Sequence, residues 1–322
     1  QFSLRWTEME RGLKIESYRE AFGRALLELG AKNDRVVVLD ADVADSTRTA
    51  LFAKHFPERF VSVGVSEQDL VGMAAGFAIS SWLPVASTLS IFLLRAWEQV
   101  RNTVARDRLN IKFVATHAGL SDFADGSSHQ SVEDIALMRT VPNMSVVVPA
   151  DAASTRSLLI QATETSGPFH IRIGKDYAPT VYVDDEPSIG KAFCLREGED
   201  VTLVACGVMV SFALEAAKHL QKKGVDAGVL DVHTIKPLDT GAIIKAAQTT
   251  GRIVTLEEHS KIGGLGGAVS EILCENHPAP VKRIGTEDCF GRSSRRYLPL
   301  LEHLGLGVSN IVAAAEELAS GT

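Results

Sequence analysis

Runs of continuous Val, Ile and Leu alternate with segments of helical spacing, and this alternation constrains the chain more than any other feature. A run of this kind, RVVVLDAD at residues 35–42, follows a segment at 16–29 whose apolar residues recur every three to four positions. Strands that are apolar at every position are buried on both faces, which is typical of parallel sheets covered by helices on both sides. We therefore expect an α/β protein with mostly parallel sheets.

One stretch rich in proline and acidic residues interrupts the alternation. This stretch contains Pro179, Asp184, Asp185, Glu186 and Pro187. A chain of 322 residues also exceeds the size at which a single core is usual. We therefore predict two consecutive α/β domains. The predicted segments are a leader at 1–14, a first α/β domain at 15–180, a linker at 181–198 and a second α/β domain at 199–322.

Charge and composition argue against several classes of partner. The net charge is −7, with 33 Lys and Arg scattered among 40 Asp and Glu, so no basic stripe is present for nucleic acid. No apolar run reaches the roughly 18 residues of a membrane span, and the first residues lack the apolar core of a signal peptide. The four cysteines form no CxxC pair, so neither a disulfide framework nor a zinc site is indicated. We expect a cytoplasmic protein that binds neither nucleic acid nor membrane.

Glu67 lies between a β-rich run at 60–65 and a small-residue run of helical spacing. This position predicts a strand-to-helix turn, and ligands of open parallel sheets bind at that end of the strands. A simpler interpretation is that Glu67 is an acid in the first helical turn, favoured by the helix dipole and preceded by Ser66 as N-cap. Both interpretations are open for Glu67 taken alone.

Further candidates follow other predicted strands. Phe92 comes after a strand at 83–90 and begins a helix predicted at 92–108, where it is either a stacking surface for a ligand or plain core. His117 ends a strand at 111–118, and a Gly-, Asp- and Ser-rich loop follows it. A histidine ring can give and take a proton near neutral pH, so a ligand site at this loop is favoured over a structural role.

Three stretches in order carry a resemblance to a known family: GVSEQDLVGMAAGFA at 64–78, STLSIFLLRAWEQVRN at 87–102, and THAGLSDFADGSSHQSVEDIALMRTVPNMSVVVPAD at 116–151. Together they resemble the pyrimidine-binding domain of the transketolase family of thiamine diphosphate enzymes. The stretches LDVHTIKPLD and TLEEHSKIGGLGGAVSE, at 230–239 and 255–271, resemble the transketolase C-terminal domain. The resemblance implies a thiamine diphosphate-binding pyrimidine domain followed by a transketolase C-terminal domain.

The resemblance implies that three residues lie at the cofactor. Glu67 matches the carboxyl group that hydrogen-bonds N1′ of the aminopyrimidine, which promotes loss of the thiazolium C2 proton. Phe92 matches the aromatic residue that stacks on the pyrimidine ring. Asp42 resembles a position near the cofactor. Helical spacing, and not the resemblance, puts Arg95 and Gln99 on one helical face after Phe92, where they lie either near the same pocket or on a solvated or subunit-facing surface.

The resemblance places a second group at the sugar substrate. Asp125 matches an acid that binds a substrate hydroxyl, and His117 and His129 match histidines that donate to substrate oxygens or shuttle protons. With Glu67, these two histidines are the expected catalytic residues.

A third group matches residues that hold the substrate phosphate, namely Arg19 and Ser46. A further arginine is expected after the strand FHIRIG, but Lys175 stands in that place, and Arg172 is expected to point elsewhere. Lysine supplies the charge without the bidentate fork of arginine. Either the grip on a phosphate is weaker here, or the preferred substrate differs.

The family holds Mg²⁺ and the diphosphate with a GDG motif and a later Asn, and no GDG occurs in these 322 residues. We therefore expect the C-terminal subunit of a split, two-gene transketolase, paired with an N-terminal diphosphate-binding subunit in an α2β2 heterotetramer. Such an enzyme moves a two-carbon ketol unit from a ketose, often a phosphate, to an aldose, as in the pentose phosphate pathway.

Three alternatives to this activity are open. A 1-deoxyxylulose-5-phosphate synthase is normally one long chain with its own GDG, and arginine is favoured where Lys175 stands. The β subunit of a 2-oxoacid dehydrogenase has no need of the trio His117, Asp125 and His129. A non-catalytic regulatory or interaction protein has no physical need for a carboxyl group beside a stacking aromatic residue.

Overall fold

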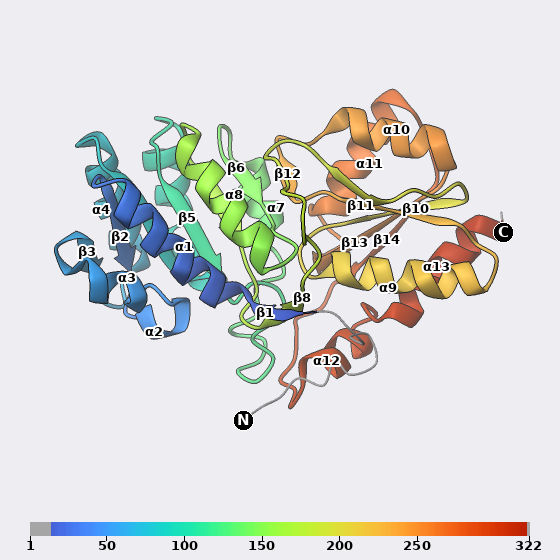
Figure 1. Cartoon of the computed structure of the whole chain (residues 1–322), viewed down its shortest axis with the longest axis horizontal. Helices are drawn as coiled ribbons and strands as arrows, with labels where there is room; N and C mark the ends of the chain where they lie inside the picture. Colours follow the sequence, from blue (N-terminus) through green and yellow to red (C-terminus); the bar gives the residue numbers. More distant parts are fainter. Residues whose placement is uncertain (1–13, 321–322) are drawn as a thin grey trace.

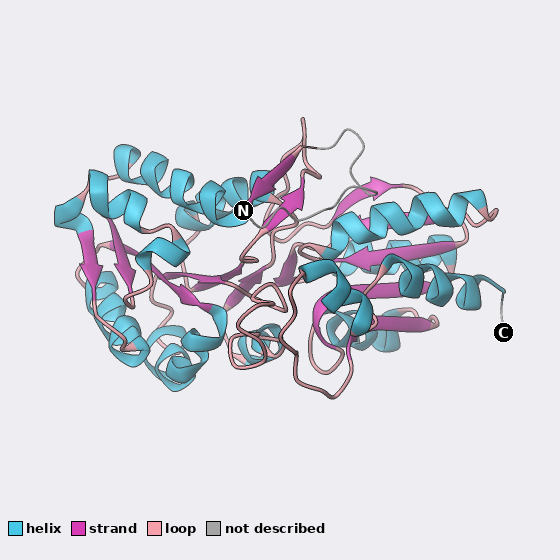
Figure 2. Cartoon of the chain, turned by 90° about the horizontal axis from the view of Figure 1, so that it is seen from below, coloured by secondary structure: helices cyan, strands magenta, loops and turns pink. Residues whose placement is uncertain are grey.

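The structure is a computed structural model of the chain, and it describes residues 14–320. Most of the predicted leader at 1–14 lies outside the described residues. Figure 1 shows two α/β units side by side, the first coloured blue to green and the second yellow to red. Figure 2 shows that helices lie on both sides of the sheets in each unit. The predicted fold class, two α/β domains with mostly parallel sheets, is confirmed.

The first sheet has seven strands in the order β12-β6-β7-β5-β4-β2-β3. All neighbouring strands run parallel except β12 and β6, which are antiparallel. The strands are β2 (Val36–Asp40), β3 (Phe60–Ser62), β4 (Leu83–Leu89), β5 (Lys112–Thr116), β6 (Ser145–Val147), β7 (Phe169–Arg172) and β12 (Thr234–Lys236).

Helices cover both faces of this sheet. Successive residues of β2 are buried on opposite faces of the sheet. Val36 and Val38 belong to one apolar cluster, and Val37 and Leu39 belong to the other. The first cluster includes α1 (Tyr18–Lys32) and α8 (Ala152–Glu164), and the second includes α4 (Glu67–Ile79) and α7 (Asp134–Thr140). The short helices α2 (Ala44–Thr47), α3 (Ala50–His55) and η1 (Pro57–Arg59) connect β2 to β3.

Two predictions about the first domain are wrong in detail. The strand expected at 60–65 ends at Ser62, and the helix expected at 92–108 is not continuous. Along the segment expected as one helix at 92–108, the backbone hydrogen bonds change from α-helical to 3₁₀ and then to π-helical. The spacing of apolar residues cannot reveal such a change. The pieces of this segment are α5 (Ser90–Leu93), η2 (Leu94–Ala96), α6 (Trp97–Gln99) and η3 (Val100–Ala105).

The second sheet has five strands in the order β14-β13-β10-β11-β9. The strands are β9 (Phe193–Arg196), β10 (Val201–Ala205), β11 (Ala227–Asp231), β13 (Ile253–Ser260) and β14 (Val281–Thr286). Only β9 is antiparallel to its neighbour. Helices α9 (Met209–Lys222) and α13 (Val308–Ser320) lie on one face, and α10 (Thr240–Thr250) and α11 (Leu265–Asn276) on the other (Figure 1).

One strand crosses from the second domain into the sheet of the first. The predicted linker at 181–198 contains β9, which is an edge strand of the second sheet. Strand β12, within the predicted second domain, instead pairs with β6 of the first sheet. The small pair β1 (Ile15–Ser17) and β8 (Tyr177–Pro179) joins the start of the first domain to its end. The domains therefore share backbone pairing as well as packing.

One stretch, Tyr297–Ser320, is long and apolar enough to cross a membrane by length and composition alone. The structure divides this stretch into α12 (Tyr297–His303) and α13, and 44% of its most apolar window is buried within the protein. Leu301 and Ile311 belong to the core of the second domain. Packing of this kind is the ordinary reason for an apolar helix in a globular domain.

Candidate active site

The predicted site residues gather because parallel strands end at one edge of the first sheet. Asp42 and Ser46 follow β2, Phe92 follows β4, His117 follows β5, and Lys175 follows β7. Glu67 follows β3 and is the first residue of α4. The carboxyl edge of a parallel sheet is where ligands bind in such folds.

Glu67 is a largely buried residue with an available carboxylate. The residue is only 7% exposed, and no hydrogen bond or ion pair joins its carboxylate to another side chain or backbone group within residues 14–320. Ser66 occupies the N-cap position, but its side chain makes no capping hydrogen bond. A carboxylate in a largely buried residue that makes no contact with a donor of its own chain is available to a donor from outside the described chain.

The segment after β4 lies against the start of α4. Nε2 of Gln68 donates to the backbone oxygen of Arg95 at 3.4 Å, which ties Glu67's helical turn to the segment that carries Phe92. The side chain of Arg95 is exposed, whereas Oε1 of Gln99 is buried without a hydrogen-bond partner among the described residues. The structure therefore provides a carboxyl group and a buried amide oxygen on neighbouring elements. These groups fit a nitrogen-rich ring such as an aminopyrimidine.

The rings of Phe92 and His129 meet edge to face. Their centroids are 5.4 Å apart and the ring planes are inclined by 68°. This contact connects the predicted cofactor wall to the predicted substrate histidine. An edge-to-face pair leaves the remaining ring surface available for a further contact.

The predicted phosphate ligands form one cluster. Nη1 of Arg19 donates to the backbone oxygen of Ser46 at 2.7 Å, and its Nε donates to the backbone oxygen of Lys175. Nζ of Lys175 lies 2.5 Å from Oδ1 of Asp122 and 3.5 Å from Oδ2 of Asp125. The lysine charge is thus already paired with two carboxylates, one of which the sequence did not indicate.

His117 is held in an uncharged form. Its backbone is left-handed, with φ of 57°, and its Nδ1 lies 2.8 Å from Oγ1 of Thr116. Burial, followed by the nearby charges of Arg19 and Lys175, lowers the pKa of His117 to about 3. At neutral pH the ring is therefore a neutral hydrogen-bonding group, which differs from the expectation that it exchanges a proton there.

The loop that carries Asp42 and Ser46 is fixed by a carboxylate at the end of β2. Asp40 accepts hydrogen bonds from the backbone N–H of Val43 at 2.7 Å and from the hydroxyls of Thr47 and Thr49, both at 2.8 Å. Asp42 itself is exposed, with a left-handed backbone at φ of 66°. The sequence predicted Asp40 only as part of the strand. Its place as an acid at the end of an apolar strand is the signal that could have indicated its role in fixing this loop.

Sequence reasoning also missed a buried ion pair beneath the site. Nε of Arg172 lies 2.8 Å from Oδ2 of Asp134, and Ser90 donates to the same oxygen at 2.8 Å. Burial alone would raise the pKa of Asp134, but the Arg172 guanidinium holds it well below its usual range. Arg172 points away from the Lys175 cluster, as expected.

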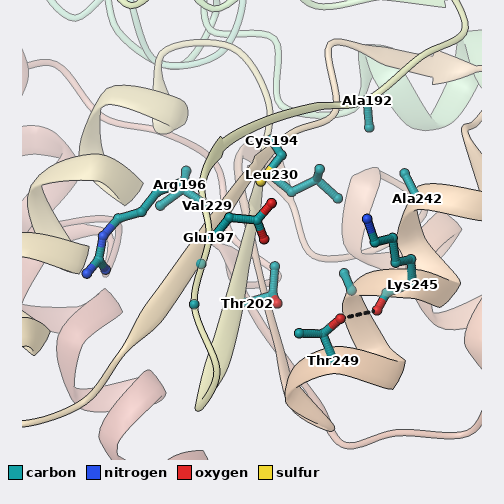
Figure 3. Close-up of a pocket in the computed structure, with 13 residues that line it drawn as sticks. Ala192, Cys194, Arg196, Glu197, Thr202, Val229, Leu230, Ala242, Lys245 and Thr249 are labelled. Carbon is teal, nitrogen blue, oxygen red and sulfur yellow. Dashed lines mark hydrogen bonds between the residues drawn. The ribbon is translucent and has the colours of Figure 1, made fainter.

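A separate cavity of about 230 Å³ lies in the second domain between the second sheet and α10 (Figure 3). Glu197 and Lys245 project into it from opposite walls, over an apolar floor that includes Val229 and Leu230. None of the predicted site residues lines this cavity. Within residues 14–320, no group of three or more His, Cys, Asp or Glu side chains is arranged to hold a metal ion.

Two α/β domains in this order, with a buried carboxyl group at a strand-to-helix turn of the first, are the arrangement of the thiamine diphosphate-dependent enzymes. The family model described as "Transketolase, pyrimidine binding domain" matches residues 16–180. The one described as "Transketolase, C-terminal domain" matches residues 190–319. The chain belongs to the transketolase family, and the resemblance found in its sequence is confirmed.

Relatives of nearly the same length are known. The "putative transketolase C-terminal section" of Methanocaldococcus jannaschii is 44% identical over 298 residues, covering 91% of this chain and 93% of that protein. A subunit of the 6-deoxy-6-sulfo-D-fructose transketolase of a Clostridium species is 40% identical over 312 residues, covering 95% of this chain and 96% of that subunit. A solved structure described as "split gene transketolase, inactive beta4 tetramer" superposes with a TM-score of 0.87 at 47% identity. It covers 94% of this chain and 98% of that one.

Proposed function

We propose that this chain is one subunit of a two-chain transketolase that transfers a two-carbon ketol unit from a ketose, or ketose phosphate, to an aldose. Thiamine diphosphate is bound between this chain and an N-terminal partner subunit, which holds Mg²⁺ and the diphosphate. The observation that carries the proposal is Glu67, a largely buried residue at the start of α4 whose carboxylate has no partner among the described residues. An unpaired carboxyl group of this kind matches what an aminopyrimidine needs.

Several residues would hold the cofactor from this side. Glu67 would receive a ring nitrogen, the Phe92 ring would form an apolar wall, and Oε1 of Gln99, which is buried without a partner among the described residues, would accept a hydrogen bond from an amino group. When bound, thiamine diphosphate supplies the nucleophilic carbon that allows a bond next to a ketose carbonyl to break. The contribution of this chain is to hold the pyrimidine ring and to exclude water from it.

Other residues would orient the sugar. Asp125 accepts a hydrogen bond from a substrate hydroxyl, and neutral His117 donates to or accepts from a substrate oxygen. His129 lies against Phe92, so its ring is placed between the cofactor wall and the substrate loop. Arg19 and Lys175 attract an anionic end group of the substrate, although Asp122 and Asp125 reduce the effective charge of Lys175.

Two facts support a partner subunit. The chain lacks a GDG motif, and relatives that it matches over nearly their full length carry names that describe a section or a subunit. The related structure described as an inactive β4 tetramer fits the same expectation for a chain without its partner. We expect an α2β2 heterotetramer.

The experiment that tests this proposal begins with co-purification from the native source. The partner is identified and inspected for GDG followed by Asn, and both chains are then produced separately. Turnover of a ketose phosphate with thiamine diphosphate and Mg²⁺ should require both chains. Turnover by this chain alone would show that the divided-site proposal is wrong.

The same reconstituted pair separates the alternatives. Condensation of pyruvate with an aldose phosphate would indicate a 1-deoxyxylulose-5-phosphate synthase activity. Decarboxylation of a branched 2-oxoacid would indicate a dehydrogenase subunit. A pair that assembles and binds thiamine diphosphate but turns over none of these substrates would favour a non-catalytic role.

A further inference from the structure

The loop that carries the predicted substrate residues is fastened to the second domain. We call residues 117–131 the substrate loop, since His117, Asp125 and His129 lie on it. The ends of the loop are joined by a backbone hydrogen bond from Gly119 to Ser131 at 2.9 Å. Some of its buried contacts stay within the first domain, such as the one from Arg172 to the backbone oxygen of Ser131, and others reach across the domain boundary.

Glu258 of β13 makes the central contact. Its Oε1 accepts the backbone N–H of Leu120 at 2.8 Å and the hydroxyl of Tyr297 at 2.6 Å. The approach is so close that a Cβ on Gly119 would lie 2.5 Å from Cδ of Glu258, and Gly119 has a left-handed φ of 65°. The loop backbone next to His117 is therefore shaped around this one carboxyl group.

A second segment of the C-terminal domain lies along the same loop. Ser294 donates its backbone N–H to the oxygen of Phe123 at 2.7 Å, and Nε2 of Gln130 donates to the backbone oxygen of Arg292 at 3.0 Å. A Cβ on Gly126, next to Asp125, would lie 2.3 Å from Oγ of Ser293. Contacts from two segments thus restrain both the start and the middle of the loop.

Glu258 is buried, and one oxygen of its carboxyl group accepts two hydrogen bonds. The residue is 5% exposed, and Arg172 donates to its backbone oxygen at 2.9 Å. A cavity of about 20 Å³, large enough for about one water molecule, is bounded by Tyr18, Arg172, Glu258 and Tyr297. An apolar side chain would fill this space at lower cost, so the carboxyl group is not explained by packing.

We propose that Glu258 is a positioning residue of the active site, through which the C-terminal domain holds the substrate loop in its productive shape. This inference rests on the proposed function, in which that loop binds the sugar. It gives the C-terminal domain a part in substrate binding in addition to assembly. Misplacing a substrate-binding group by about 1 Å costs on the order of 100-fold in rate.

The test compares Glu258→Ala and Glu258→Gln in the reconstituted two-chain enzyme. The alanine variant should raise KM for the sugar and lower kcat/KM by about 10-fold or more, while heterotetramer formation and thiamine diphosphate affinity stay unchanged. The glutamine variant keeps an oxygen that accepts from Leu120 and Tyr297, so it should recover most of kcat/KM. Wild-type kcat and KM in Glu258→Ala would overturn the proposal.

The neighbouring residue provides a matched control. Glu257 is equally buried, but it accepts from the backbone N–H groups of Leu265 and Gly266, within the second domain. Glu257→Gln should change thermal stability without changing KM. If it changes KM as much as Glu258→Ala does, the effect is a general loss of stability and the proposal fails.

Hydrogen exchange gives a readout that does not depend on the reaction. In the purified chain, Glu258→Ala should speed amide exchange of Leu120 and its loop neighbours by at least 10-fold and leave α11 unchanged. Tyr297→Phe removes one hydrogen-bond donor to Glu258 and should speed loop exchange in the same way but by less. This variant provides the test if Glu258→Ala does not fold. Unchanged amide exchange of the substrate loop in both variants contradicts the positioning role. If the loop amides exchange faster in the variants but the reconstituted two-chain enzyme has no transketolase activity, only the proposed function is contradicted.

Discussion

Nζ of Lys175 lies 2.5 Å from Oδ1 of Asp122, whose side chain is only 2% exposed. This pair stands where the family pattern led us to expect an arginine that grips a substrate phosphate. Burial raises the pKa of Asp122, and the Lys175 ammonium opposes that shift by favouring the carboxylate. The ion pair therefore partly neutralises the cation that we propose to face the substrate.

Removing the Asp122 charge should strengthen the grip on a phosphate. We expect Asp122→Asn to lower KM for a ketose phosphate by about 3- to 10-fold, because Lys175 then keeps only its longer contact with the exposed Asp125 and attracts the dianion more strongly. KM for an uncharged ketose provides the control and should not change. An equal change for both substrates would mean that the variant acts through loop shape and not through charge.

Glu67 should be indispensable to turnover but not to assembly. In the reconstituted enzyme, Glu67→Gln should lower kcat by about 100-fold or more, because the amide cannot exchange a proton with the cofactor ring. Asp69→Asn, an exposed acid in the same first turn of α4, is the matched control and should keep near-normal activity. Near-normal turnover by Glu67→Gln would show that Glu67 is not the carboxyl group that activates the cofactor.

His117 should remain neutral throughout the physiological pH range. Its pKa is lowered to about 3, so its ring signals in an NMR titration should not shift between pH 5 and pH 8. A midpoint near pH 6.5 for His117 would contradict this prediction.

The same pKa predicts how stability depends on pH. The unfolded chain protonates His117 below about pH 6.5, whereas the folded chain does not until about pH 3, so unfolding takes up a proton between these values. Stability should therefore fall as the pH falls, by about 1–2 kcal/mol between pH 7 and pH 5 from this group. His117→Asn should remove that part of the loss in urea unfolding at the two pH values.

Breaking the buried Asp134–Arg172 pair should be strongly destabilising. Asp134→Ala leaves the Arg172 guanidinium without its carboxylate in the core, which costs about 3–5 kcal/mol. The midpoint of urea unfolding measures this loss. Asp107→Ala, which breaks an exposed pair with Arg106, should leave the midpoint nearly unchanged.

The fold could be predicted because its main signal is local. Continuous apolar runs such as those in β2 and β4 identify buried parallel strands, and residues just after them lie at the ligand edge of the sheet. Glu67, Phe92 and His117 were found by this rule together with the family resemblance. Their placement needs no knowledge of distant parts of the chain.

The residues that sequence reasoning missed depend on long-range contacts. Glu258 contacts Leu120, which lies far from it in the sequence. Asp122 has a role only as the ion-pair partner of Lys175, which follows β7. The broken helix after Phe92 was missed because a change in hydrogen-bond spacing leaves the apolar pattern almost intact. The Glu258 contact, the Asp122–Lys175 pair and the broken helix all depend on tertiary structure and not on local propensity.

The placement of β12 has a consequence for any attempt to cut the chain. Strand β12 supplies the outer edge of the first sheet, although it is followed and preceded by elements of the second. A fragment that stops within residues 181–198 would leave the backbone groups of β6 unpaired along one side, and open edges of this kind recruit strands from other molecules. Protease nicking in that segment followed by separation of the pieces should therefore produce aggregates of the N-terminal piece, not a soluble pyrimidine-binding domain.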